Sequence, residues 1–279
     1  MSLHHFFLDG QVLELETEPC FALRLSPEDA KHARVLRLEP GEHLSVVDAA
    51  QDYFECEVVS TDGDIVVRIA QKLDASEDGP TVVLAQGLAK GDKMDDIVRH
   101  ATEVGVSGFV PLACSRSVVK LDAKKAAAKT QRWQAIARSA AMQAGRTLVP
   151  EVSEPVSIAQ AVDLFAEATA VLVCWEECPA TSTIASALGS AFEECGVRDV
   201  RDARIVVVVG PEGGLSASEV EALAAGRRAW PVTLGSSILR TETAGVVAPA
   251  LVLYECGGMG RGRGGMSCSD SPGLARTAQ

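Results

Sequence analysis

The sequence predicts an α/β protein in which a small N-terminal β-barrel precedes a larger domain built on a mostly parallel sheet. Two observations predict this class. Up to residue 75, short segments alternate between apolar and polar residues, which is typical of half-buried strands. After residue 80, continuous apolar runs alternate with segments of helical period, as in a parallel sheet that is covered on both faces.

The predicted N-terminal domain covers residues 1–75. Phe54, Cys56 and Val58 alternate with two glutamates, and residues 65–69 repeat the pattern. Glycines at positions 41 and 63 supply turns between such runs, so we expect the strands to pair antiparallel into a small barrel. The polar segment 74–80 ends in Gly-Pro and is typical of a linker.

The predicted second domain covers residues 80–256. Residues 81–85, 170–175 and 205–209 are continuous apolar runs and predict buried strands. Apolar residues from Met94 to Val104 recur at helical spacing and stop at Gly105, and a second helix is expected after Asp122. Residues 257–279 hold seven glycines without periodicity, which predicts a disordered tail.

Composition excludes several classes of protein. No apolar run approaches the ~20 residues of a membrane span, and the N-terminus lacks a basic and apolar leader, so we expect a soluble, cytoplasmic protein without a membrane partner. The eight cysteines form no C-x-x-C pair and the five histidines have no ligand spacing, so no metal is expected. The G-x-S-x-G and H-E-x-x-H motifs of hydrolases are absent from the sequence.

Charge is unevenly distributed along the chain. The net charge is −12, and residues 1–78 alone carry 17 acidic against 6 basic residues. Residues 86–146 reverse the balance, with 11 basic against 5 acidic residues. Such a stretch is either a solvated helix face or a surface that binds a polyanion such as RNA.

Two glycine-containing loops follow predicted strands. Residues 205–209 lead directly into Gly210-Pro-Glu-Gly-Gly214, and Ser216 with Glu219 then fits a capping box that begins a helix. Residues 230–245 repeat the arrangement, with a short strand to Gly235 and a charged pair at the start of the last helix. A third loop follows at 175–179. Ligands bind at the carboxyl ends of parallel strands, so these three loops could together wall one pocket, although the sequence does not show that they meet.

The two glycine-containing loops together resemble the RsmE family, the 16S ribosomal RNA uridine-N3 methyltransferases of the SPOUT superfamily. The motifs that carry the resemblance are Gly210-Pro-Glu-Gly-Gly214 and Leu234-Gly-Ser-Ser-Ile-Leu-Arg-Thr-Glu-Thr-Ala244. Supporting matches are His32–Arg37, Lys90–Met94, Ala101–Gly105, Arg116-Ser117 and Gln143–Arg146, and the likeness spans about residues 3–255. Ser237 departs from the arginine usual in the family, and Pro249 is expected to kink the last helix.

The resemblance implies a SPOUT-type domain with a deep trefoil knot, a PUA-like RNA-binding barrel, and a homodimer that acts on 16S rRNA in the small ribosomal subunit. It also implies S-adenosyl-L-methionine as cofactor and no metal. The expected cofactor contacts are Trp175, Gly210, Pro211, Glu212, Gly213, Gly214, Leu234, Gly235, Ile238 and Leu239.

Methylation of uridine N3 requires loss of a proton and stabilisation of the negative charge that spreads over the flanking carbonyl oxygens. Arg240 is the candidate for that stabilisation, because a guanidinium stays charged and offers two parallel donors. Glu212 or Glu242 would orient this arginine or accept the proton, and the sequence does not choose between them.

RNA contacts are expected mainly with phosphates. The candidate side chains are Arg37, Arg116, Lys120, Lys125, Lys129, Arg132 and Arg146. Three alternatives remain open at this point: a SPOUT enzyme that methylates a ribose 2′-hydroxyl or a tRNA base, a ribosome-assembly factor without catalytic activity, and a nucleotide-binding regulator.

Overall fold

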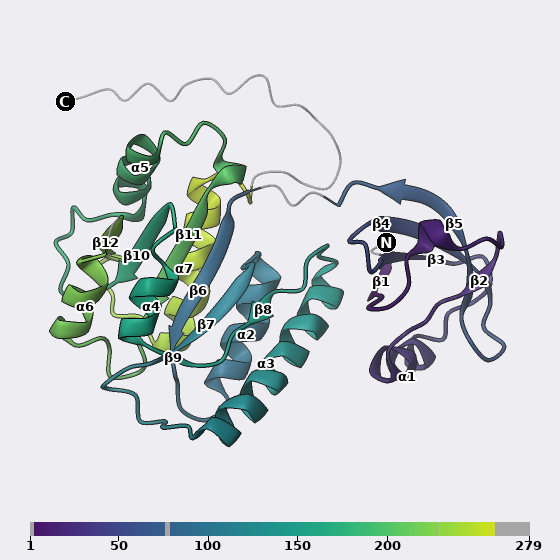
Figure 1. Ribbon diagram of the computed structural model, residues 1–279, viewed down its shortest axis with the longest axis horizontal. Coiled ribbons are helices and arrows are strands. Elements are labelled where there is room, and N and C mark those ends of the chain that lie inside the picture. The colour runs from purple at the N-terminus through teal and green to yellow at the C-terminus, as the bar shows by residue number, and fades with distance from the viewer. Residues whose placement is uncertain (1–2, 76–78, 227, 260–279) are drawn as a thin grey trace.

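Two β-sheets, formed by separate parts of the chain, organise the computed structural model, which describes residues 3–75, 79–226 and 228–259 (Figure 1). The first sheet has the strand order β1-β3-β4-β5-β2. Its strands are β1 (His4–Phe7), β2 (Phe21–Ala22), β3 (His43–Val47), β4 (Tyr53–Ser60) and β5 (Val66–Leu73), with a short 3-10 helix η1 (Leu13–Leu15). Its apolar face closes over Phe6, Leu44 and Phe54, which are at most 2% exposed.

The pairing in this first sheet corrects the expected antiparallel arrangement at one edge. β3, β4 and β5 pair antiparallel, and so do β2 and β5, but β1 runs parallel to β3. A parallel pair needs a long crossover connection. The chain supplies it between β1 and β3, where helix α1 (Pro27–Leu36) begins at Ser26, whose hydroxyl accepts a hydrogen bond from the Asp29 amide at 3.1 Å.

The second sheet has the order β12-β10-β11-β6-β7-β8, with β9 also paired to β7, and every pair in it is parallel. Its strands are β6 (Thr81–Gly87), β7 (Gly108–Ala113), β8 (Glu151–Val152), β9 (Val156–Ser157), β10 (Ala170–Cys174), β11 (Arg204–Val209) and β12 (Ala229–Val232). A mixed α/β fold with a mostly parallel sheet is therefore confirmed.

Helices cover both faces of this sheet (Figure 1). One face packs against α2 (Lys93–Val104), α3 (Ala123–Ala144), α5 (Ile184–Cys195) and α7 (Thr241–Glu255), and the other against α4 (Ile158–Leu164) and α6 (Ala217–Ala224). Ile205 and Val207 point to the first face and Val206 to the second, all fully buried. Burial on both faces explains why residues 205–209 of β11 are a continuous run of apolar residues.

Helix boundaries follow the local signals in the sequence. Gly105 ends α2 with φ 116°, and Asp122 caps the start of α3 by accepting a hydrogen bond from the Lys125 amide. The capping box of Ser216 and Glu219 is formed at the start of α6. Helix α7 continues through the buried Pro249 as a single element, and the kink expected there stays a prediction.

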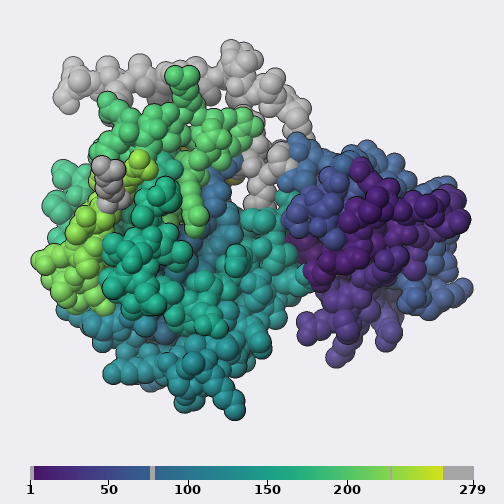
Figure 2. Space-filling view, viewed as in Figure 1, coloured from purple at the N-terminus to yellow at the C-terminus, as the bar shows by residue number. Residues whose placement is uncertain are grey.

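The two sheets are joined through α3 (Figure 1). Arg138 on this helix donates to Asp9 Oδ1 at 2.8 Å, to the Phe7 carbonyl at 2.9 Å and to Asp29 Oδ2 at 3.0 Å. Phe7 also packs against Ala141 in a small apolar cluster. Figure 2 shows the purple N-terminal region against the teal part of the chain that contains α3. The contact fixes the N-terminal region beside the α/β region.

Several expectations concern residues that the structure leaves undescribed. Residues 76–78 of the expected linker and 260–279 of the glycine-rich tail lie outside the described residues, while residues 256–259 form a turn. Within the described ranges, no helix has the length and apolar character needed to cross a bilayer. The same ranges contain no group of three or more histidine, cysteine or acidic side chains arranged to hold a metal ion.

Candidate functional site

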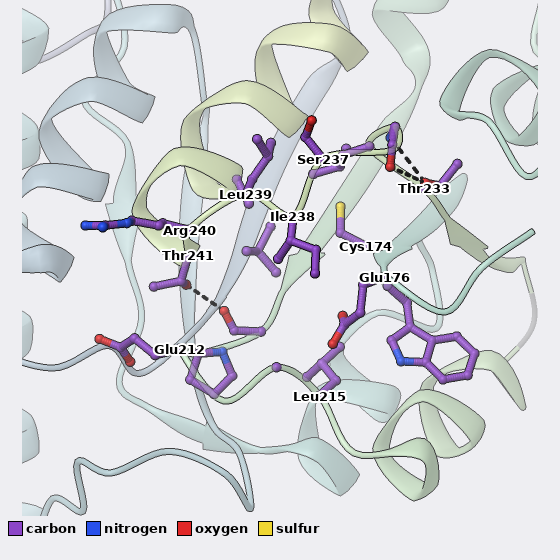
Figure 3. A pocket seen from close by; sticks show the side chains of 18 of the residues that line it. Cys174, Glu176, Glu212, Leu215, Thr233, Ser237, Ile238, Leu239, Arg240 and Thr241 are labelled. Atoms are coloured by element: carbon purple, nitrogen blue, oxygen red, sulfur yellow. Dashed lines mark hydrogen bonds between the residues drawn. The ribbon is translucent and has the colours of Figure 1, made fainter. Parts of the chain in front are cut away.

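The loops that follow β10, β11 and β12 meet at the carboxyl edge of the parallel sheet and enclose a pocket of about 420 Å³. Figure 3 shows Arg240 and Glu212 at one end of this pocket and Cys174 and Glu176 at the other. The volume lies within the roughly 300–1,000 Å³ that is typical of small-molecule sites. Its walls combine backbone groups of glycine-containing loops with apolar side chains such as Leu215, Leu234 and Leu239.

The loop Gly210–Gly214 turns too sharply to carry side chains at its ends. A Cβ atom at Gly210 would lie 2.9 Å from both the Gly214 carbonyl carbon and the Leu215 nitrogen. Gly214 has φ 69°, and its amide donates to the Pro211 carbonyl at 2.9 Å to close the turn. Only glycine fits this tight return without strain, so the loop leaves its backbone open to the pocket.

Two buried polar side chains fix the start of this loop. The Thr241 hydroxyl, in the first turn of α7, donates to the Gly210 carbonyl at 2.6 Å, as drawn in Figure 3. Gln86, at the end of β6 and 1% exposed, donates to the Thr241 hydroxyl at 2.9 Å and to the Gly210 carbonyl at 3.3 Å. Segments that are far apart in the sequence therefore share one hydrogen-bond network below the pocket.

Arg116 holds the same loop from outside. Its Nη1 donates to the carbonyls of Gly213 and Leu215, each at 3.2 Å, although the side chain remains exposed. The residue was expected to bind RNA phosphate. Its position shows a second task, since two of its hydrogen bonds are given to the backbone of the glycine-rich loop.

A charged cluster stands beside the pocket. The Lys93 ammonium group lies 3.3 Å from Glu212 Oε1 and 3.0 Å from Glu242 Oε2, and the Lys90 amide donates to Glu212 Oε1 at 3.0 Å. Burial tends to raise the pKa of Glu212, but hydrogen bonds from the Lys90 amide and its own amide, with the Lys93 charge, lower it overall. Its own backbone amide and the Lys93 charge lower the pKa of Glu242.

Arg240 lies at the end of the second loop, at the N-cap position of α7. Its side chain is exposed and lines the pocket, and it makes no hydrogen bond or ion pair with the parts of the chain that the structure describes. Nearby, Ile238 is 87% exposed at the pocket rim. The guanidinium is therefore available to a ligand, but neither Glu212 nor Glu242 orients it in this structure.

The structure brings together most of the residues expected at the site. Those lining the pocket are Trp175, Gly210, Pro211, Glu212, Gly214, Leu234, Gly235, Ile238, Leu239 and Arg240. Gly213 lies in the same loop but faces Arg116, and Glu242 pairs with Lys93 outside the lining. Whether these residues bind a cofactor or act in catalysis stays a prediction.

Sequence reasoning missed several residues at the pocket. Cys174 and Glu176 flank Trp175 in the lining, Thr233 precedes Leu234, and Lys93 reaches the pocket from α2. The first three had a usable signal, because they immediately follow or border predicted strand ends. Lys93 lies in the motif Lys90–Met94 that supports the family resemblance, but that motif does not place it at the pocket. Gln86 had no signal, since only the packing of β6 brings it to the loops.

The candidate RNA-binding residues are scattered over the molecule. Arg37 ends α1 in the N-terminal region, Lys120 precedes α3, and α3 carries Lys125, Lys129 and Arg132. Arg146 corrects the expectation: it is 8% exposed and donates to the carbonyls of Thr102 and Val106. A guanidinium buried among backbone carbonyls does not contact phosphate, so Arg146 holds the end of α2 instead.

Comparison with known proteins shows the family of this chain. Residues 77–253 match the model of the RNA methyltransferase domain. The chain is 33% identical to the ribosomal RNA small subunit methyltransferase E of Bacillus subtilis, over 91% of this chain and 97% of that protein. The protein of the same name from Mycobacterium tuberculosis is also 33% identical, over 77% and 79% of the two chains. The chain belongs to this RNA methyltransferase family.

Solved structures related to this RNA methyltransferase family share the architecture. A putative methyltransferase from Legionella pneumophila, in complex with the bound cofactor SAM, is 30% identical with a TM-score of 0.72, covering 91% of this chain and 98% of that one. A ribosomal RNA small subunit methyltransferase E from Neisseria gonorrhoeae, bound to S-adenosyl methionine, is 26% identical with a TM-score of 0.73 over the same shares.

Proposed function

We propose that this protein transfers a methyl group from S-adenosyl-L-methionine to N3 of a uridine in 16S ribosomal RNA, acting as a homodimer on the small ribosomal subunit. The observation that carries the proposal is the pocket where the Gly210–Gly214 loop and residues 233–241 meet, in a chain of the RNA methyltransferase family. The names of the relatives supply the ribosomal target.

The pocket fits S-adenosyl-L-methionine. Its turn at Gly210 has no room for a Cβ atom, so backbone groups can approach a ligand closely, and Leu234 and Leu239 offer apolar contacts for an adenine ring. The residues proposed to hold the cofactor are Trp175, Gly210, Pro211, Glu212, Gly213, Gly214, Leu234, Gly235, Ile238 and Leu239. Bound, the cofactor supplies an electrophilic methyl group carried on a sulfonium.

Arg240 is proposed to act on the substrate base. Uridine N3 carries a proton at neutral pH, and the anion formed by its loss spreads charge over two carbonyl oxygens. A guanidinium with no protein partner among the described residues can donate to one of these oxygens and stabilise that anion. Glu212 and Glu242 lie in the charged part of the site near this side chain, and one of them is proposed to accept the proton that N3 loses, while the methyl donor leaves as S-adenosylhomocysteine.

RNA is proposed to lie across α3 and the N-terminal region. Lys120 and Lys125 are exposed, Lys129 is half-buried, and Arg132 and Arg37 are exposed. These side chains would contact phosphates, which gives affinity without reading the sequence and makes binding depend on salt. Arg138 would keep the two regions in the relative position that such a surface requires.

The finer fold assignments are part of the proposal. Residues 1–75 would form a PUA-like RNA-binding barrel and residues 80–256 a SPOUT methyltransferase domain whose chain is knotted, as the sequence motifs suggest. Two observations support the assignment of the second domain. The pocket lies at the carboxyl edge of its sheet, and the last helix, α7, packs against the central strands β6 and β11. The cytoplasm is the compartment where such a substrate would be met.

The test is to incubate the purified protein with S-adenosyl-L-methionine and small ribosomal subunits that lack the modification, and then to analyse the nucleosides of the digested RNA. The expected product is 3-methyluridine at one site. A 2′-O-methylated nucleoside, or methylation of tRNA only, would reassign the target. Absence of cofactor binding would favour a ribosome-assembly factor without catalytic activity.

A further inference from the structure

Lys93 occupies a position between two carboxylates that belong to different parts of the pocket. It lies in the first turn of α2, while Glu212 belongs to the glycine-rich loop after β11 and Glu242 to the first turn of α7. The Lys93 side chain also lines the pocket and is 34% exposed. We propose that Lys93 is the positioning residue of this site, which holds Glu212 and Glu242 as ionised carboxylates and thereby fixes the glycine-rich loop against α7. The inference rests on the proposed function.

The contacts around Glu212 support a role as an anchor. One oxygen of this carboxylate receives the Lys90 amide at 3.0 Å and lies 3.3 Å from the Lys93 ammonium group. Lys90 lies just before the N-cap Asp92 and Lys93 begins α2, so the carboxylate joins the glycine-rich loop to the start of that helix. A carboxylate bound in this way is stabilised in its charged form and is a poor acceptor for a substrate proton.

Glu242 depends on Lys93 more strongly. Its Oε2 atom is shielded from solvent and lies 3.0 Å from the Lys93 ammonium group. The other charge that acts on it is Arg240, two residues away at the N-cap of α7. Without Lys93, a shielded carboxylate oxygen would lose its nearest counter-charge, and Glu212 and Glu242 would repel each other.

The same contacts fix the backbone position of Arg240. The residue starts α7, and the same first turn carries Thr241, which is bonded to Gly210, and Glu242, which is paired with Lys93. Two links thus hold this turn against the glycine-rich loop. One is the neutral Thr241–Gly210 hydrogen bond, and the other runs through Lys93, which pairs with both Glu242 and Glu212. Loss of the ion pair should let the loop and the turn move apart and enlarge the pocket.

The experiment compares the full-length K93M, K93R, E242Q and K93M/E242Q proteins, with K72M as the matched control. Lys72 also bridges two carboxylates, Glu14 at 2.8 Å and Asp52 at 2.9 Å, but it lies in the N-terminal region away from the pocket. Affinity for S-adenosyl-L-methionine is measured by calorimetry from about pH 5 to 8, and stability by urea unfolding of the same samples.

We expect K93M to weaken cofactor binding about 10-fold at neutral pH, which corresponds to ~1.4 kcal/mol. Protonation of a carboxylate relieves the repulsion, so the affinity of K93M should recover as the pH falls, whereas the wild-type affinity should stay level. K93M/E242Q should regain most of the affinity and lose the pH dependence. K93R should bind within about 3-fold of wild type, because the charge is retained, and K72M should be unchanged.

Wild-type affinity in K93M, or binding that E242Q does not restore in the K93M background, would overturn the proposal. Tighter binding by K93M would also overturn it, because simple excess negative charge would attract the cationic cofactor. If K93M does not fold, K93M/E242Q should still fold and bind, and its failure to do so counts against the proposal.

These arms separate the inference from the proposed function. If the wild-type protein makes no 3-methyluridine but the affinities change as described, the target is wrong and the role of Lys93 stands. If the wild-type protein does not bind the cofactor, the proposed function fails. Lys93 is then judged by whether the urea midpoint falls in K93M and recovers in K93M/E242Q.

Discussion

Lys72 in the N-terminal region and Lys93 in the α/β region each pair with two carboxylates, but the segments that they connect lie at very different separations along the chain. Lys72 connects strand β5 to Glu14 in η1 and to Asp52, which directly precedes β4, the strand already paired with β5. Lys93 connects α2 to a loop and a helix more than a hundred residues further along the chain. Ion pairs with similar distances therefore differ in their structural effect. The effect depends on which segments of the chain each pair connects.

The same difference applies to the two regions as a whole. The ion pairs within the N-terminal region are at least partly exposed, as in Arg68–Glu57, whose side chains are 57% and 30% exposed. Such pairs contribute little to stability, with a median of about 0–1 kcal/mol. In the α/β region, buried Gln86 and Thr241 tie distant segments at the pocket. We therefore expect substitutions at the pocket of the α/β region to affect activity most, and substitutions elsewhere to affect mainly stability.

The largest expected effect is on activity in the α/β region. Arg240→Ala should lower the rate of methyl transfer at least ~10²-fold, because it removes a charged donor from the developing anion. Folding should be nearly unchanged, since the side chain makes no cap hydrogen bond and is exposed. Single-turnover rates and a thermal melt test both statements. Arg201→Ala, which removes an exposed arginine paired with Asp199, is the control. Normal turnover in Arg240→Ala would remove this residue from the mechanism.

A substitution in the glycine-rich loop should affect both binding and stability. Gly210→Ala places a Cβ atom 2.9 Å from backbone atoms of Gly214 and Leu215, so the turn must open. Cofactor affinity should fall about 10-fold or more, and the free energy of unfolding should drop by ~1–3 kcal/mol. Calorimetry and urea unfolding measure the two effects.

Gly189→Ala in α5 is the matched control for the loop substitution, because a Cβ atom there meets nothing within 4 Å. Alanine is the better helix former, so this variant should gain up to ~1 kcal/mol in stability and keep its cofactor affinity. Equal behaviour of the two alanine variants would show that the turn at Gly210 tolerates a side chain.

Substitution at the junction of the two regions should change RNA binding but leave the cofactor pocket intact. Arg138→Ala removes three hydrogen bonds and leaves the buried Asp29 without its arginine partner. We expect a loss of ~1–2 kcal/mol in stability and weaker RNA binding at unchanged cofactor affinity. Asp9→Asn removes only the more exposed of the two ion pairs and should cost less than ~1 kcal/mol. Unchanged RNA affinity in Arg138→Ala would show that the junction does not position the RNA-binding surface.

The smallest effect should be a pH-dependent one at the start of α6. Burial tends to raise the pKa of Glu219, but hydrogen bonds from Ser216 and Ser115 lower it overall. A lowered pKa in the folded state means that the carboxylate stabilises the protein above about pH 4 and that this contribution is lost as the pH falls through the lowered pKa.

Glu219→Gln should therefore cost ~1 kcal/mol at neutral pH, because an amide cannot accept both backbone hydrogen bonds with its NH₂ group. The difference from wild type should shrink in acid, as urea unfolding at several pH values would show. A difference that stays constant down to about pH 3 would contradict the assignment of the effect to the charged carboxylate.

The sequence was most informative where structure is local. The run at 205–209 predicted a strand covered on both faces, and Gly105, Asp122 and the Ser216–Glu219 pair predicted helix ends that the structure contains. Each of these signals acts within a few residues. The parallel pairing of β1 with β3 was not predicted, because strand direction depends on where α1 carries the chain.

Prediction was weaker where function depends on distant contacts. The two glycine-containing loops were recognised as walls of one pocket because strand ends share an edge of the sheet. No pattern around Lys93 or Gln86 indicates that packing brings them to those loops, and no pattern around Arg146 indicates that it is buried. Charge alone counted Arg146 as a phosphate contact.

The hydrogen bond between Gln86 and Thr241 also bears on how the protein is made. It closes a separation of 155 residues along the chain, and Thr241 lines the pocket at the carboxyl edge of the sheet. Contacts of such long range are slow to form in folding, because a large part of the chain must first be ordered. A nascent chain that has not yet released α7 from the ribosomal tunnel lacks Thr241, Glu242 and Arg240 at the pocket. Completion of this pocket thus requires synthesis of nearly the whole chain.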